Sequence, residues 1–354
     1  MPATTTRPRR RHFGAPSATA LAAATLGSLL AAACGASTPD AAPAASGGTA
    51  TLAATAAAVA DAGASTLAPP EALGTQRAAG KVPVYGRNFG GPGFDDGQLQ
   101  LPTAIAVDAA GNAYVSDSVG VQVFDAAGRF ARRVAAGELV AVNGIAVTPD
   151  GARLYVAQRE PPVRVFDAAG APAGTVGAVG DGPGQLAQPA ALALDAAGQL
   201  YVADAANGRI EVFGPGGAHV RTIGEKGTGR GQFSQPRALA VGPDGRVYVG
   251  TGDSYAIQVF APDGTYEKSL AHGYKDATLY RIAGLALDDD GRLYASEAAS
   301  HYVQVFADGA WVADLGKLGS GSTQFNTPTG LAFAAGQLYV VDQQNSRVQV
   351  FTTP

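Results

Sequence analysis

Cysteine, methionine, tryptophan and histidine are scarce in this chain of 354 residues, which has one Cys, one Met, one Trp and four His. Because Cys34 has no second cysteine to pair with, an intrachain disulfide and any multi-cysteine metal site are excluded. The four histidines, His12, His219, His272 and His301, leave little for a histidine-built metal centre.

Long helices are also excluded, because the chain contains 48 Gly and 22 Pro. In a helix interior each Gly costs about 1 kcal/mol and each Pro about 3 kcal/mol relative to Ala. The composition therefore predicts a fold of strands and turns.

The first 34 residues have the features of a secretory signal. Arg7, Arg9, Arg10 and Arg11 are followed by an apolar, alanine-rich run over residues 18–33, and no Asp or Glu precedes Cys34. The run is shorter than the roughly 20 residues that span a bilayer. We therefore expect residues 1–34 to be a signal peptide and the protein to be exported to the cell envelope.

The residues around Cys34 resemble a bacterial lipobox, in which the cysteine becomes the lipidated first residue of the mature protein. The lipobox usually has Leu three residues before the cysteine, where this chain has Ala31. Ordinary cleavage after Ala33, giving a free periplasmic or extracellular protein, therefore stays open. Arg10 and Arg11 also resemble a twin-arginine signal, so two export routes are open. A lipid anchor at Cys34 would be the protein's only contact with the membrane.

Residues 35–80 are rich in Ala, Thr, Ser, Pro and Gly and have almost no large apolar side chain, so they predict a flexible tether. Residues 1–34 carry 4 of the 25 basic groups and no acid, so their removal leaves 21 basic against 29 acidic groups, a net charge of −8. Nucleic acid is therefore not an expected partner, since phosphate binding needs an excess of Lys and Arg.

A repeat of about 46 residues fills the chain from residue 81 onward. Each unit has an apolar strand, an Asp-x-x-Gly turn, a strand with a central Tyr, and a strand that ends in Val-Phe. The tyrosines are Tyr114, Tyr155, Tyr201, Tyr248, Tyr294 and Tyr339, and the phenylalanines are Phe124, Phe166, Phe213, Phe260, Phe306 and Phe351. Six units of this size predict an all-β, six-bladed β-propeller with four antiparallel strands in each blade.

The residue types fit the radial geometry of a propeller. The middle residue of the first strand is alanine in every unit, Ala106, Ala146, Ala193, Ala240, Ala286 and Ala332. Only a small side chain fits near the axis, whereas the Tyr and Phe fill the widening space between blades. The last unit ends after its third strand, so residues 82–90 are expected to supply its outer strand and close the ring.

The repeat resembles the NHL repeat, whose family forms six-bladed propellers. The resemblance rests on Gly-Gln-(Leu/Phe)-x-x-Pro, Tyr-Val-Ala-Asp and Asn-x-Arg-(Ile/Val)-x-Val-Phe. Residues 201–213 and 339–351 match best, with Asn207, Arg209, Asn345 and Arg347 in place. The resemblance covers residues 81–354 and implies a fold, but no particular activity.

Candidate binding residues lie where blades two and five depart from the repeat, on the rim around the channel mouth. Blade two is preceded by Glu138 and Asn143 and has Arg159 in its second-to-third-strand loop, and blade five has His272, Tyr274, Lys275, Arg281 and His301 in the corresponding places. Arg237, at the start of blade four, is a further candidate for capture of an anionic group. We expect these residues to bind a protein, a peptide or a cell-wall component.

No cofactor is expected. The carboxylates Asp117, Asp204, Glu297 and Asp342 end the second strands, where they are expected to accept backbone hydrogen bonds in their own tight loops. Similar propellers include zinc-dependent peptidyl-hydroxyglycine lyases and metal-dependent gluconolactonases, so a hydrolase or lyase with a divalent metal such as Ca or Zn is the alternative. Since no catalytic motif is present, a non-catalytic, monomeric binding or sensing module is the preferred interpretation.

Overall fold

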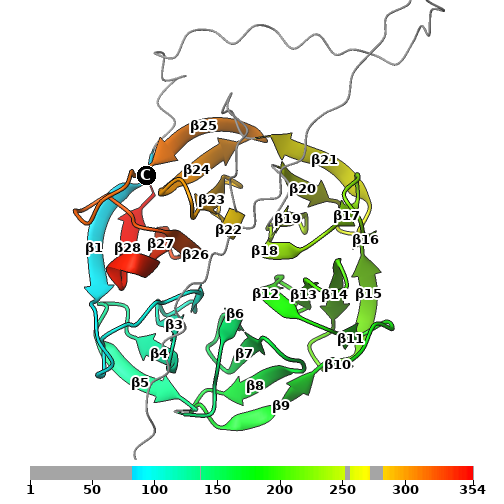
Figure 1. Cartoon of the computed structure of the whole chain (residues 1–354), viewed down its shortest axis with the longest axis horizontal. Helices are drawn as coiled ribbons and strands as arrows, with labels where there is room; N and C mark the ends of the chain where they lie inside the picture. Colours follow the sequence, from blue (N-terminus) through cyan, green and yellow to red (C-terminus); the bar gives the residue numbers. More distant parts are fainter. Residues whose placement is uncertain (1–81, 136, 252–255, 272–281, 354) are drawn as a thin grey trace, which may run out of the picture. The chain divides into compact units, whose positions relative to one another are not determined.

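A computed structural model describes residues 82–135, 137–251, 256–271 and 282–353. These residues form six four-stranded antiparallel sheets arranged as the blades of a β-propeller (Figure 1). The single helical element among them is the short 3-10 turn η1 (Gln343–Asn345), and none of their segments is a helix long and apolar enough to cross a bilayer. The predicted all-β class and six-bladed architecture are confirmed. The predicted signal peptide, Cys34 and the whole predicted tether fall outside the described residues.

Each blade runs from an inner strand at the channel to an outer strand at the periphery of the propeller. Its strands pair in chain order, apart from the outer strand of blade six. Blade one is β2 (Ile105–Val107), β3 (Ala113–Asp117), β4 (Gly120–Phe124) and β5 (Phe130–Val134). Blade two is β6 (Val142–Val147), β7 (Arg153–Gln158), β8 (Val163–Asp167) and β9 (Pro172–Val176). Blade three is β12 (Pro189–Leu194), β13 (Leu200–Asp204), β14 (Arg209–Phe213) and β15 (His219–Ile223).

The other three blades repeat this order. Blade four is β18 (Pro236–Val241), β19 (Val247–Thr251), β20 (Ala256–Phe260) and β21 (Tyr266–Ala271). Blade five is β22 (Ile282–Leu287), β23 (Leu293–Glu297), β24 (Tyr302–Ala307) and β25 (Ala310–Leu315). Blade six contains β26 (Pro328–Ala334), β27 (Gln337–Asp342) and β28 (Arg347–Thr352).

A crossing segment leads from the outer strand of one blade to the inner strand of the next. The segment before blade three contains the parallel pair β10 (Ala178–Val179) and β11 (Gln185–Leu186). The segment before blade four contains the equivalent pair β16 (Glu225–Lys226) and β17 (Gln232–Phe233). These two crossing segments are therefore ordered parts of the fold, and each leads to the inner strand of the next blade.

Blade six joins the beginning and the end of the propeller. Its outer strand is β1 (Val84–Gly90), which pairs antiparallel with β28 and places Tyr85 opposite Phe351. Figure 1 shows β1, in cyan, beside β28, in red. The sheet order is β1-β28-β27-β26, so β1 covers the edge that β28 would otherwise leave open.

The hydrophobic core consists of six clusters, each between two neighbouring blades. Every cluster contains the second-strand Tyr of one blade and the third-strand Phe of the next. Tyr114 thus packs in one cluster with Phe166, and Tyr339 packs with Phe124 where the last blade meets the first. The aromatic side chains predicted from the repeat therefore hold the blades to one another.

Close approach of the inner strands keeps their side chains small. A Cβ added to Gly144 in β6 would lie 3.0 Å from the backbone oxygen of Ala190 in β12. Gly284 in β22 meets the backbone oxygen of Thr329 in β26 in the same way. This crowding explains why residues with little or no side chain recur along the inner strands.

Candidate functional site

The described residues surround a cavity of about 540 Å³ at one end of the central channel, which we call the channel-mouth cavity. All six blades contribute to its wall, for example through Thr103 of blade one, Gln188 of blade three and Gln343 of blade six. These side chains come from the starts of the inner strands and from second-to-third-strand loops. Six repeated elements thus produce one central hollow.

Three of the residues predicted from the sequence line this cavity: Asn143, Arg237 and His301. The Nδ2 of Asn143 donates to the backbone oxygen of Pro189 at 3.2 Å. The Nη2 of Arg237 donates to Oε1 of Gln235 at 2.6 Å, and within the described part of the chain its other N–H groups have no hydrogen bond to a side chain or backbone. The fold therefore brings together polar side chains of blades two, four and five.

His301 is held by an unusual backbone conformation. Its φ of 63° lies in the left-handed region, where the equivalent residues of blades three and six are Gly208 and Ser346. Its Nδ1 accepts a hydrogen bond from the backbone N–H of Thr327 at 3.0 Å. The neutral imidazole therefore carries its proton on Nε2, so it can donate a hydrogen bond at the cavity wall.

The other predicted residues do not join this group. Glu138 is held by Arg164 of β8, whose Nη2 lies 2.9 Å from Glu138 Oε2. Arg159 is exposed in the loop between β7 and β8, and neither Glu138 nor Arg159 lines the cavity. The remaining predicted residues, His272, Tyr274, Lys275 and Arg281, lie outside the described residues.

The carboxylates at the ends of the second strands differ from the expectation in blades three, five and six. Asp117 accepts a bond from the N–H of Val119 within its own loop, as expected. Asp204 instead accepts bonds from the N–H groups of Ala187 and Gln188, at 3.1 and 2.9 Å, in the crossing segment. In blade six Asp342 similarly accepts the N–H of Asn326. Asp204 and Asp342 therefore bind the crossing segment to the blade that follows it.

Glu297 occupies the same position in blade five but has lost the side-chain donors. In blade three, Asn207 Nδ2 donates to Asp204 at 2.6 Å, whereas blade five has Ser300 in place of Asn207. Both carboxylate oxygens of Glu297 are buried, and no donor among the described residues reaches them. Burial raises the pKa of Glu297 to about 8. Sequence reasoning grouped Glu297 with the aspartates and missed this difference.

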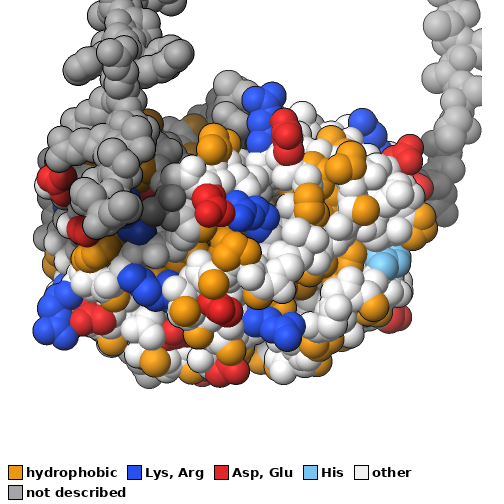
Figure 2. Space-filling model, turned by 90° about the horizontal axis from the view of Figure 1, so that it is seen from below, with side chains coloured by type: hydrophobic (Ala, Val, Ile, Leu, Met, Phe, Trp, Pro, Cys, Tyr) orange, Lys and Arg blue, Asp and Glu red, His pale blue; other side chains and the backbone are white. Residues whose placement is uncertain are grey.

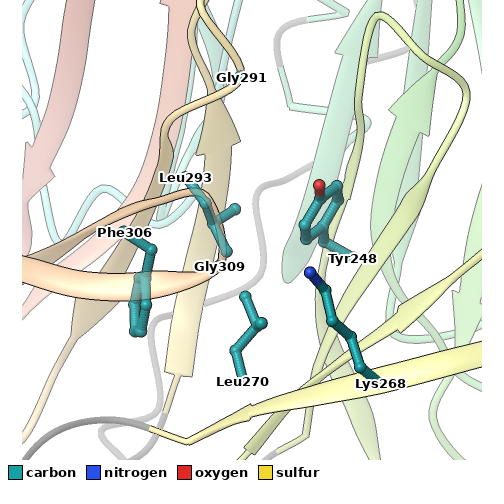
Figure 3. A pocket seen from close by; sticks show the side chains of 7 residues that line it. All are labelled: Tyr248, Lys268, Leu270, Gly291, Leu293, Phe306 and Gly309. Carbon is teal, nitrogen blue, oxygen red and sulfur yellow. The ribbon is translucent and has the colours of Figure 1, made fainter.

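A second pocket, of about 20 Å³, lies between blades four and five (Figure 3). Figure 3 shows the Nζ of Lys268, on β21, directed towards Tyr248 of β19. Blade three has the same pairing, with Arg221 placed 5.6 Å from the ring centre of Tyr201. The cation beside the tyrosine ring is therefore a repeated contact within a blade, and the pocket has room for about one water molecule.

The surface seen in Figure 2 has Lys and Arg side chains interspersed with Asp and Glu. Several of these charges are paired, as in Arg246, which contacts both Asp244 and Glu267. Among the described residues, no three His, Cys, Asp or Glu side chains form a metal-binding cluster. The channel-mouth cavity is therefore the candidate site that the described side chains support best.

Comparison with known proteins supports the fold. The NHL repeat family profile matches residues 186–213 and 325–351. No curated protein matches the sequence. A gluconolactonase from Xanthomonas campestris is structurally similar, with a TM-score of 0.58, 18% sequence identity and coverage of 77% of this chain and 100% of that one.

Two further solved structures show the same likeness. A structural genomics protein of unknown function from Bacteroides thetaiotaomicron has a TM-score of 0.58 and 18% identity over 75% of this chain and 73% of that one. A chain of the nidogen/laminin complex has a TM-score of 0.54 and 20% identity over 68% and 89%. At such identities the likeness concerns the fold alone. The repeat matches and the six four-stranded blades together identify this chain as an NHL-repeat β-propeller.

Proposed function

We propose that this protein is an exported, non-catalytic binding module of the cell envelope, whose channel-mouth cavity captures an anionic group of a protein, peptide or cell-wall component. The observation that carries the proposal is the convergence of Arg237, Asn143 and His301 on one cavity. An arginine guanidinium, an amide and an imidazole N–H are donors that suit a carboxylate.

The size of the cavity also supports binding. Its volume of about 540 Å³ falls within the range of roughly 300–1,000 Å³ that is common for small-molecule sites. Part of the wall is apolar, with Val142, Ala190 and Ile282 beside the polar groups. Such a mixture favours a ligand that has a charged end and an apolar body, for example the end of a peptide.

The test is calorimetric titration with a short peptide that ends in a free carboxylate, next to the same peptide with an amidated end. We expect the carboxylate form to bind more tightly, and Arg237→Gln to weaken it about 10-fold or more, since a hydrogen bond to a charged group contributes about 1.5–3 kcal/mol. His301→Gly should also weaken binding and should fold normally, because Gly208 occupies the same place in blade three.

Arg159→Ala is the matched control, because Arg159 is an exposed arginine that does not line the cavity. Equal binding of the two peptides, or full binding by Arg237→Gln, would contradict the proposal. Metal-dependent turnover of a lactone that is lost in Asn143→Ala would replace it with the hydrolase or lyase alternative.

A further inference from the structure

The polar lining of the channel-mouth cavity differs between its two sides. Core clusters join each blade to the next and the last blade to the first, so blade four lies across the ring from blade one (Figure 1). Blade four contributes Arg237, which is the one Lys or Arg among the described lining residues. Blades six, one and two contribute polar residues that carry no charge: Thr103, Asn143, Thr327, Thr329 and Gln343. A ligand with its carboxylate at Arg237 therefore presents uncharged groups to the far side.

Three of the uncharged lining residues are carboxamides, Gln188 of blade three, Asn143 of blade two and Gln343 of blade six. A carboxamide offers an acceptor oxygen and an NH₂ donor. Asn143 uses one N–H on the backbone oxygen of Pro189 and keeps its own oxygen as an acceptor. A peptide group has one donor and one acceptor as well. It can therefore form two hydrogen bonds with one carboxamide, which makes a backbone amide a well-matched partner for these side chains.

The backbones that carry two of these carboxamides are held on both sides. The N–H of Gln188 donates to Asp204 at 2.9 Å, and its backbone oxygen accepts the N–H of Ala205 at 2.9 Å. The N–H of Gln343 donates to the oxygen of Thr327 at 3.3 Å, and its backbone oxygen accepts the N–H of Ser346 at 3.1 Å. A fixed backbone lowers the entropy that binding costs, because fewer torsion angles have to be ordered.

We propose that the ligand of the channel-mouth cavity is the C-terminal end of a peptide, whose terminal carboxylate lies at Arg237 and whose backbone amides pair with Gln188, Asn143 and Gln343. The inference rests on the proposed function and specifies the neutral part of the ligand. A sphere of the cavity's volume is about 10 Å across, which is the length of about three residues of extended chain. The cavity thus reads the last two or three residues.

The test is calorimetric titration with N-acetyl-Ala-Ala and with octanoate, a carboxylate of the same chain length that has no amide. We expect Gln188→Met and Gln343→Met to raise the dissociation constant of the acetylated dipeptide about 2- to 10-fold each, because each variant removes hydrogen bonds between neutral groups. Both variants should bind octanoate like the wild type. Arg237→Gln should weaken the binding of both acids, since they share the carboxylate.

Gln344→Met is the matched control, because Gln344 is the exposed neighbour of Gln343 and does not line the cavity. It should bind both acids like the wild type. The amide proposal is overturned if the two glutamine variants bind the acetylated dipeptide normally, or if they weaken octanoate equally. Tighter binding of glucuronate than of the dipeptide would also overturn it, in favour of a hydroxylated acid.

These outcomes differ from a failure of the proposed function. Normal binding of the dipeptide by the glutamine variants, together with weak binding by Arg237→Gln, leaves carboxylate capture in place and removes only the role of the amides. If the wild type binds neither acid, or if Arg237→Gln binds both fully, carboxylate capture itself is wrong and the amide proposal falls with it.

Discussion

The hydroxyl groups of two buried tyrosines bind the aspartate of the preceding hairpin turn. Tyr294 donates to Asp288 at 2.9 Å, and Tyr201 donates to Asp195 at 3.3 Å, so the Asp of the hairpin turn holds the Tyr of the next strand. Burial and the nearby Asp288 raise the pKa of Tyr294. The Asp-x-x-Gly turn and the central Tyr are therefore parts of one local unit.

We expect Tyr294→Phe to lower the free energy of unfolding by about 1–2 kcal/mol, because it removes this bond and leaves a buried acceptor. Denaturant titration measures the change. Tyr155→Phe is the control, since blade two has Thr148 at the position of Asp288 and its Tyr has no such carboxylate. An equal loss in both variants would contradict the assigned role of the Asp.

The burial of Glu297 predicts that the stability of the protein depends on pH. Its folded-state pKa is raised to about 8 from 4.5, so the folded protein holds a proton that the unfolded chain has released. Stability should be highest below pH 4.5 as far as this group is concerned and should fall through about pH 8, with a slope of about 1.4 kcal/mol per pH unit between these values.

Glu297→Gln should remove this slope, because glutamine does not titrate, and should make the protein more stable than the wild type at pH 8. Unfolding in denaturant at pH 5, 6.5 and 8 measures both effects. Parallel pH profiles for the two proteins would show that Glu297 ionises normally.

At the scale of elements, arginines on the outer strands connect neighbouring blades. Arg221 of β15 donates to the hydroxyl of Tyr201 at 2.9 Å and to the backbone oxygen of Pro262 in the next blade at 2.8 Å. Arg132 of β5 and Arg87 of β1 reach the backbone oxygens of Ala168 and Ala126 in the same way. These hydrogen bonds connect neighbouring blades in addition to the aromatic contacts of the core.

Arg221→Ala should cost about 1–2 kcal/mol of unfolding free energy, because it removes one hydrogen bond within blade three and one across the boundary to blade four. Arg230→Ala, at an exposed arginine in the crossing segment before blade four, should cost far less. Chemical denaturation of both variants compares them directly. A similar cost at the two positions would mean that the contact to Pro262 contributes nothing specific.

The strands were predictable from the sequence because the length of the repeat and its regular buried positions fit few other folds. The repeated Tyr and Phe define the strands, and the inner alanines define the axis. The cavity was predictable only in part, because the rule used was departure from the repeat. That rule found Asn143 and His301, but it missed Gln188 and Thr103, which line the cavity from regular positions beside a proline. A position at the start of an inner strand predicts a cavity-lining residue better than departure from the repeat does.

On the scale of the whole molecule, the pairing of β1 with β28 joins the first strand of the propeller to the last. Deleting residues 82–90 should lower the melting temperature of the entire ring, since the deletion exposes the edge of β28 and removes the aromatic contact of Tyr85 with Phe351. Calorimetry tests this expectation. An unchanged transition would show that the ring is stable without its closing strand.

That pairing also dictates an order of events during folding. Ribosomes release β1 long before β28, whereas blades one to five are assembled from strands that follow one another closely in the chain. Contacts between distant segments form slowly, because the chain between their ends must first be ordered. We therefore expect blade six to be completed last, with the environment of Tyr85 reporting the final step of folding.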